Sequence, residues 1–389
     1  MFARPRQTYF RRRGWKDLVF LAVVSTLALG ASRLSQFRSD FDKWKVRAAL
    51  GPAAPRGRSG AIPCFFTVPA TANDQPVSSG SIGDCQMLTP NGRKLELFEV
   101  DLWNGEFVPV NTDLYVPGKI PLAFTRVTLP MDEWSKRFRI FFRDVYDPFL
   151  FGDRLPYTYV QLLMPDNTHV YYKRISKGAG YSDAVYECDV ALPTFFQSRI
   201  NWNGWGWDIA LEDGTTLLSP EAYNAKRPQQ GSLAGIFDND GHEVRISRRA
   251  NGDLTEIKSP SEGWIRLTYS QDKIVEAKDS LGNVVEYRYD GQDRLETVEY
   301  PEKRGLTYAY DSSNRIIDVL DVHGNSILKV LYDSAGRVIE QRLPSGSKYS
   351  FRYGLMQDGM NPWVEISGPR MDTNRVTLDG SGYSIGKTH

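Results

Sequence analysis

A tandem repeat between Trp264 and Tyr353 constrains the fold of this chain more than any other feature of its sequence. A tyrosine ends a strand-like run in each of five successive units, and the intervals between these tyrosines are 20, 21, 22 and 21 residues. In three of the units an aspartate follows the tyrosine, and a short turn then leads to Arg-Leu, Arg-Ile or Arg-Val. A fixed period of this length is typical of repeat architectures, so we expect stacked copies of one small unit.

Each unit predicts two short strands and two turns. Residues two apart, such as Tyr287 and Tyr289, share one face of a strand, so stacked strands would carry a row of aromatic and aliphatic side chains. After the tyrosine, aspartate can accept backbone hydrogen bonds and glycine or asparagine supplies a positive φ, so the chain reverses there. The second turn alternates between an Asp-x-x-Gly form, as in Asp238–Gly241, and a form with Pro and Gly, as in Pro260–Gly263. The residues that define the repeat are Tyr269, Tyr289, Asp290, Tyr310, Asp311, Tyr332, Asp333, Gly336 and Tyr353.

The runs Tyr-Asp-Gly-Gln-Asp-Arg-Leu from Tyr289 and Tyr-Asp-Ser-Ala-Gly-Arg-Val from Tyr332 resemble YD repeats. These are the units of Rhs proteins, bacterial wall-associated YD proteins and animal teneurins, and the resemblance extends over roughly residues 110–354. In these families the repeats wind into a large hollow β-shell, and the bacterial toxins enclose a C-terminal effector that self-cleavage releases. The resemblance implies a mainly β fold, in which a curved antiparallel YD-repeat sheet forms a partial Rhs-type β-shell. The apolar N-terminal residues predict a hydrophobic helix in front of this sheet.

The sequence departs from the toxin members of that family. About five repeat units are recognisable, the residues after Tyr353 leave no room for a toxin domain, and the closing motif of the family has no counterpart near residue 389. Asp147-Pro148 precedes the repeats, where a cleavage role makes no sense. We therefore expect neither encapsulation nor autoproteolysis, but an open sheet whose exposed edge would pair with another chain unless it is covered.

The first 62 residues predict export and membrane attachment. Residues 1–16 contain six basic residues and no acidic residue, and the largely apolar run Leu18–Ala31 follows. Residues 17–32 are therefore a signal anchor or a signal peptide, although a membrane span usually needs about 20 apolar residues. Residues 33–62 combine an amphipathic helix, suited to the lipid surface, with a Pro/Gly/Arg-rich linker. We expect an inner-membrane anchor with the repeats outside the cytoplasm, or a periplasmic or secreted protein if the signal is cleaved.

The remaining chain is predicted to contain three parts. Residues 63–150 read as an N-terminal β domain, residues 151–354 as the Rhs/YD-repeat sheet, and residues 355–389 as an irregular C-terminal tail. Because exported proteins meet an oxidising environment, a disulfide between Cys64 and Cys85 is plausible.

No catalytic signature accompanies the repeats. The sequence has four histidines, in or beside predicted turns or at the C-terminus, and it lacks a zinc-protease helix, a nucleophile elbow and a phosphate-binding glycine loop. The turn Asp238–Gly241 faintly resembles a calcium loop but lacks two of its acidic ligands, so we interpret it as a hairpin turn. We therefore predict a non-enzymatic protein with no cofactor and no metal site. The net charge of +1 gives no reason to expect nucleic acid as a partner.

A tryptophan cluster has two interpretations. Trp202, Trp205 and Trp207 lie beside two asparagines, and exposed tryptophans next to amides can stack on sugar rings, whereas buried ones fill a core. Positions 205 and 207 would share a strand face, and large aromatic side chains are usually mostly buried, which favours the core.

Three functions are compatible with these observations. The first is a non-enzymatic exported protein whose repeat sheet is a structural, binding or assembly surface in the cell envelope, with a protein or an envelope glycan as its partner. The second is a split or remnant component of an Rhs polymorphic-toxin delivery system. The third is a carbohydrate-binding or polysaccharide-active protein, which would use the tryptophan cluster.

Overall fold

The computed structural model describes most of the chain after residue 94, within one compact unit that spans Gly57–His389. In the part of the chain that is described, no helix has the length and apolar character needed to cross a membrane. The predicted N-terminal helix, the linker, Cys64 and Cys85 lie outside the described residues. The described residues are 95–96, 99–118, 120–128, 142–153, 156–165, 169–188, 195–222, 224–356, 359, 361–369, 371–378 and 384–388.

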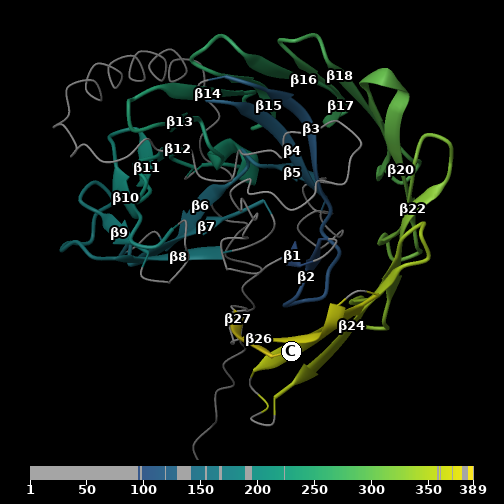
Figure 1. Cartoon of the computed structure of the whole chain (residues 1–389). Helices are drawn as coiled ribbons and strands as arrows, with labels where there is room; N and C mark the ends of the chain where they lie inside the picture. The colour runs from purple at the N-terminus through teal and green to yellow at the C-terminus, as the bar shows by residue number, and fades with distance from the viewer. Residues whose placement is uncertain are drawn as a thin grey trace, which may run out of the picture. The chain divides into compact units, whose positions relative to one another are not determined.

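One large antiparallel sheet dominates the fold, and each of its strands pairs with the next strand in sequence (Figure 1). The series begins with β6 (Phe149–Gly152) and ends with β27 (Ser384–Thr388). Among the described residues, no pairing register joins these two end strands to each other. The predicted mainly β, antiparallel architecture is thereby confirmed.

The strands between these ends are short. They are β7 (Tyr159–Leu163), β8 (His169–Arg174), β9 (Val185–Glu187), β10 (Arg199–Trp202), β11 (Gly206–Ala210), β12 (Thr216–Pro220), β13 (Gly235–Phe237), β14 (Glu243–Arg248), β15 (Leu254–Lys258), β16 (Trp264–Ser270), β17 (Lys273–Asp279), β18 (Val284–Tyr289), β19 (Leu295–Tyr300), β20 (Arg304–Tyr310), β21 (Ile316–Leu320), β22 (Ser326–Tyr332), β23 (Val338–Arg342), β24 (Lys348–Leu355), β25 (Pro362–Gly368) and β26 (Met371–Leu378). Two 3₁₀ turns, η1 (Pro228–Gly231) and η2 (Pro301–Lys303), interrupt the series.

The repeat strands have a buried face and a solvated face. In β18, Val285 and Tyr287 are buried whereas Glu286 and Arg288 are exposed, because successive side chains of a strand point to opposite sides. We call the face with the buried side chains the inner face and the other the outer face. Cross-strand ion pairs such as Arg288–Glu299 cover the outer face.

A small sheet lies against the inner face. It consists of β3 (Val110–Val116), β4 (Leu122–Thr128) and β5 (Phe142–Asp144), and its first two strands contact β16 and β17 (Figure 1). Every residue of β4 is buried, and its Leu122 and Phe124 belong to the same hydrophobic cluster as the apolar side chains of the repeats. A further pair, β1 (Leu95–Glu96) and β2 (Val100–Asp101), precedes it. The chain therefore covers part of the inner face with its own residues.

The C-terminal region differs from the expectation of an irregular tail. Residues 355–389 contain β25, β26 and β27, which extend the repeat sheet beyond Tyr353. Val364 and Ile366 in β25, and Val376 and Leu378 in β26, are buried with a period of two. The Gly and Pro residues around these short runs obscured that alternation in the sequence.

Candidate functional site

Successive repeat units are joined by the tyrosines that define the period. The hydroxyl group of Tyr310 donates a hydrogen bond to the backbone oxygen of Leu295, the residue that opens the returning strand of the preceding unit, at 2.6 Å. The same bond recurs at 2.7–2.8 Å in three other units, so each of these four tyrosines ties its strand to the returning strand of the unit before it. These bonds join Tyr289 to Ile274, Tyr332 to Ile316 and Tyr353 to Val338.

The aspartate after the tyrosine organises the turn. Oδ1 of Asp311 accepts hydrogen bonds from the backbone N–H groups of Ser313 and Arg315, both at 2.9 Å. Its Oδ2 accepts from Nε of Arg315 at 2.8 Å. Burial raises the pKa of this carboxyl group, but the hydrogen bonds from Arg315 and the charge of Arg315 outweigh burial, so the pKa is lowered. Asp290 and Asp333 make the same contacts with Arg294 and Arg337.

The arginine that closes each turn also contacts the next unit. The guanidinium carbon of Arg294 lies 4.5 Å from the ring centroid of Tyr310, which is the geometry of a cation–π contact. Arg315 lies over Tyr332 and Arg337 over Tyr353 at similar distances. Tyrosine, aspartate and arginine thus form one repeating joint, in which each residue type has a structural contact.

The first joint of the series uses a different residue. Arg248 stands where a tyrosine would be expected, and its Nε donates a hydrogen bond to the backbone oxygen of Leu233, 15 residues earlier. Its other nitrogens bind Oδ1 of Asp147 at 2.9 Å and the backbone oxygen of Tyr146 at 2.6 Å. An arginine here can therefore replace the tyrosine and also hold the segment that precedes β6.

A buried ion pair of the small sheet lies where that sheet contacts the repeats. Arg126 on β4 binds both carboxylate oxygens of Asp113 on β3, at 2.9 and 3.2 Å, and both side chains are 0% exposed. Burial is the largest single influence and would lower the pKa of Arg126, but the charge of Asp113, the hydrogen bond to Asp113 and the nearby Tyr308 and Tyr300 together raise that pKa. Two charges removed from water need such geometry and further hydrogen bonds to be tolerated.

Three tyrosines of the repeats supply those further hydrogen bonds. The hydroxyl groups of Tyr287 and Tyr300 each donate to one oxygen of Asp113 at 2.8 Å. Nη1 of Arg126 donates to the hydroxyl group of Tyr308 at 3.3 Å. Burial, followed by the charge of Asp113, raises the pKa of Tyr287 and Tyr300. We call Asp113, Arg126, Tyr287, Tyr300 and Tyr308 the buried polar centre.

The charged pair of the buried polar centre was not among the residues that the sequence singled out, and Tyr287 was expected only as part of an aromatic row. Tyr287 and Tyr308 lie two positions before repeat-defining tyrosines, and Tyr300 ends a returning strand. The side chains of all three point to the inner face. Their partners lie 174 to 187 residues away in sequence, so no local pattern pointed to the contact.

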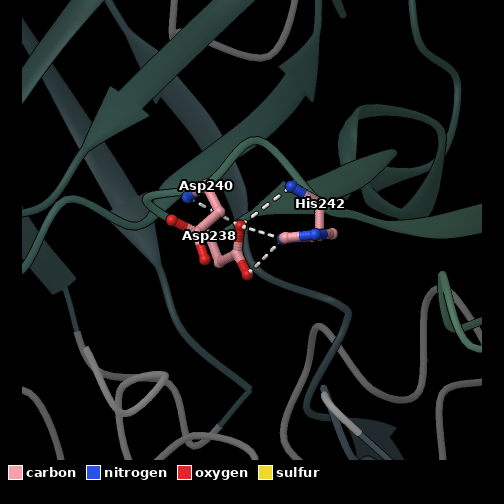
Figure 2. Close-up of side chains that lie close together, drawn as sticks. All are labelled: Asp238, Asp240 and His242. Atoms are coloured by element: carbon pink, nitrogen blue, oxygen red, sulfur yellow. Dashed lines mark hydrogen bonds and ion pairs between the residues drawn. The ribbon is translucent and has the colours of Figure 1, made fainter. Parts of the chain in front are cut away.

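The turn at Asp238 brings Asp238, Asp240 and His242 together with the spacing of possible metal ligands (Figure 2). Oδ1 of Asp238 accepts from the backbone N–H groups of Asp240 and His242, and its carboxylate meets Nδ1 of His242 at 2.9 Å. The turn at Asp279 has the same contacts, with Asn283 in the place of the histidine. The geometry is therefore that of the other repeat turns, which agrees with the interpretation of this segment as a hairpin turn.

The three tryptophans do not form a flat platform. Trp202 and Trp207 pair across β10 and β11, and their rings meet edge to face with centroids 5.2 Å apart. Trp207 is only 6% exposed and its indole N–H donates to Glu221. Trp205 lies in the turn before β11, so it does not share a strand face with Trp207 as the alternation suggested. The cluster gives the sugar-stacking interpretation no support.

Comparison with known proteins identifies the repeat region. Residues 260–357 match a family model described as Teneurin YD-shell. No curated protein matches the chain.

Solved structures similar to this chain include a TcdB2-TccC3-TEV crystal structure, with 15% sequence identity and a TM-score of 0.30. The match covers 70% of this chain and 16% of that chain. A structure of the Photorhabdus luminescens Tc holotoxin pore matches with 15% sequence identity and a TM-score of 0.29. This match covers 66% of this chain and 14% of that chain. The chain therefore spans about a sixth or less of the length of these neighbours.

Proposed function

Because this chain is an Rhs/YD-repeat protein, with its repeats matched over residues 260–357, we propose that it is a non-enzymatic assembly module of the cell envelope. In this role the repeat sheet is a rigid scaffold that docks to another protein. The export pattern of the first 62 residues supports a location outside the cytoplasm.

The buried polar centre carries this proposal. Asp113 and Arg126 are completely buried against Tyr287, Tyr300 and Tyr308, so the inner face of these repeats is filled by the chain's own small sheet. This part of the sheet is therefore not a container for a guest. The surfaces that remain for docking of another protein are the outer face and the edges of the sheet.

The edge at β27 is a better docking surface than the outer face or the edge at β6. The outer face of the repeats carries charged side chains that already pair with each other across strands, for example Arg266 with Glu256. A strand at the end of a sheet presents backbone N–H and C=O groups that a strand of another protein can pair with. The other end strand, β6, already meets Ser232 through a bridge at Phe149.

Site-specific photo-crosslinking in the native cell tests this function. A photoreactive amino acid would replace Lys387 on β27, Arg288 on the outer face, or Val330 on the inner face, in three separate full-length variants. We expect an intermolecular adduct from position 387, and none from position 330, because that side chain is 2% exposed. Only intramolecular products from both 387 and 288 would contradict an assembly role.

A further inference from the structure

A cavity of about 200 Å³ lies between the segment 104–107 and two successive repeat joints. Phe107, Tyr310 and Tyr332 provide aromatic parts of its wall, while Asn104 and Arg315 provide polar parts. The cavity is distinct from the edge at β27 and from the buried polar centre.

The joints around this cavity differ in one position, the residue that precedes the arginine of each turn. In two successive units this residue has a positive φ and a side chain that accepts a hydrogen bond from the cation of the preceding unit. Asp293 pairs with Lys273 in this way. Asn314 accepts from Nη1 of Arg294 at 3.0 Å.

Glycine occupies the corresponding position in the next unit, Gly336, with a φ of 86°. A Cβ atom at this position would lie 3.3 Å from Nη1 of Arg315. Nε and Nη2 of Arg315 bind Asp311, and within the described residues no protein group accepts from its Nη1. The missing side chain therefore leaves a donor directed at the cavity where the earlier joints have a protein acceptor.

The size of the cavity suits one six-membered ring. An engineered cavity of about 150 Å³ in another protein binds benzene, which sets the scale for this comparison. A ring in this cavity would meet the aromatic side chains of Phe107, Tyr310 and Tyr332. Rings that have apolar faces and a polar rim match such a mixed wall better than benzene does.

The polar part of the wall indicates a neutral ligand with hydroxyl or amide groups. Glu106 brings a carboxylate to the cavity, and Nδ2 of Asn104 donates to it at 2.8 Å. Arg315 shares its charge with Asp311, so a negatively charged ligand would gain little attraction and would be repelled by Glu106. A hydroxyl group can donate to Glu106 and accept from Arg315 at the same time.

We propose that this cavity binds one neutral sugar ring, such as a hexose or an N-acetylhexosamine residue of an envelope glycan. The ring occupies the space that the side chain of residue 336 would fill, and one of its oxygens accepts from Nη1 of Arg315. This inference goes beyond the assembly role and does not require that a protein docks at β27.

Isothermal titration of the full-length protein tests the inference, with glucose and N-acetylglucosamine as probes and phenol as a ring without the hydroxyl set. The main variant is Gly336→Asn, which places an amide oxygen near Arg315, as Asn314 does for Arg294. Asparagine tolerates a positive φ better than most residues. The matched control is Gly324→Asn, since Gly324 also has a positive φ of 79° but a Cβ there meets nothing within 4 Å.

We expect at least one sugar to bind the wild type saturably, and Gly336→Asn to weaken that binding by about tenfold or more, because it fills the cavity and occupies the donor. Gly324→Asn should bind as the wild type does. Glu106→Gln removes the carboxylate without changing the size of the side chain and should also weaken sugar binding. This variant is a second test of the proposal if Gly336→Asn does not fold. Absence of sugar binding by the wild type, equal binding by Gly336→Asn, or equally strong binding of phenol would overturn the proposal.

Discussion

The two faces of the repeat sheet place the same kinds of charged side chain in opposite surroundings. Against the inner face, Asp113 and Arg126 are 0% exposed. Asp113 accepts hydrogen bonds from Tyr287 and Tyr300, and Arg126 donates one to Tyr308. On the outer face, Arg288 and Glu299 are 62% and 42% exposed. Water screens the outer pair but cannot reach the inner one, so the two pairs should differ by several kcal/mol in what their disruption costs.

The largest effect is expected from Asp113→Ala. It leaves the guanidinium of Arg126 buried without its counter-charge, which should lower the free energy of unfolding by about 3–5 kcal/mol. Urea denaturation of the full-length protein measures this change. The double variant Asp113→Leu/Arg126→Met removes both charges and should cost less than the single variant; if it costs more, the buried charge is not the source of the loss.

A smaller effect is expected at Glu99, whose pKa burial raises to about 7 despite a backbone hydrogen bond from Val110 and the charge of Arg126. The folded protein holds this proton more tightly than the unfolded chain, so stability should fall as the pH rises from about 4.5 to 7. Glu99→Gln cannot ionise and should be more stable than the wild type by about 2 kcal/mol near pH 8, but equally stable near pH 4. Denaturation curves at both values measure the difference, and a constant difference would exclude this ionisation as its cause.

Removal of one joint hydrogen bond should have an intermediate effect. Tyr310→Phe keeps the ring under Arg294 but loses the bond to the backbone oxygen of Leu295, so we expect a loss of about 1 kcal/mol. Tyr171→Phe is the control, because Tyr171 is 42% exposed on the solvated side of β8. Equal stabilities of the two variants would show that the joint hydrogen bond contributes little.

The smallest effect is expected from Arg288→Ala on the outer face. Exposed ion pairs of this kind contribute about 0–1 kcal/mol, and salt weakens them further. Thermal denaturation at low and high salt should show a small difference that shrinks as the salt concentration rises. A loss as large as that of Asp113→Ala would contradict the contrast between the two faces.

Much of the repeat fold could be predicted because its signals are local. The aspartate at 311 reaches the backbone of residues 313 and 315 within its own turn, so the turn is encoded in five consecutive residues. The contact between Arg315 and Tyr332 also recurs with the period. The strands after Tyr353 were missed because they do not carry the Tyr-Asp signal, although their apolar residues still alternate.

The candidate sites were less predictable than the fold. The tryptophans at 202, 205 and 207 stood out in the sequence, but their exposure depends on how β10 and β11 pair, and this pairing buries Trp207. Conversely, Asp113 and Arg126 resembled ordinary surface charges of a half-buried strand. Gly336 looked like a turn former, and its relation to Arg315 became visible only when successive joints were compared in space.

The sequence by itself therefore determined the period, the β-strands, the turns and the resemblance to YD-repeat proteins, because these depend on residues at most one unit apart. The tertiary structure decided which face is filled, since the partners Asp113 and Tyr287 are 174 residues apart and meet only when the small sheet lies on the repeats. The residues between such partners are compatible with many chain conformations, and only the packing of the inner face selects the one in which the partners meet. The tandem tyrosines thus build a scaffold, and the small sheet packed on its inner face determines which of its surfaces remain exposed.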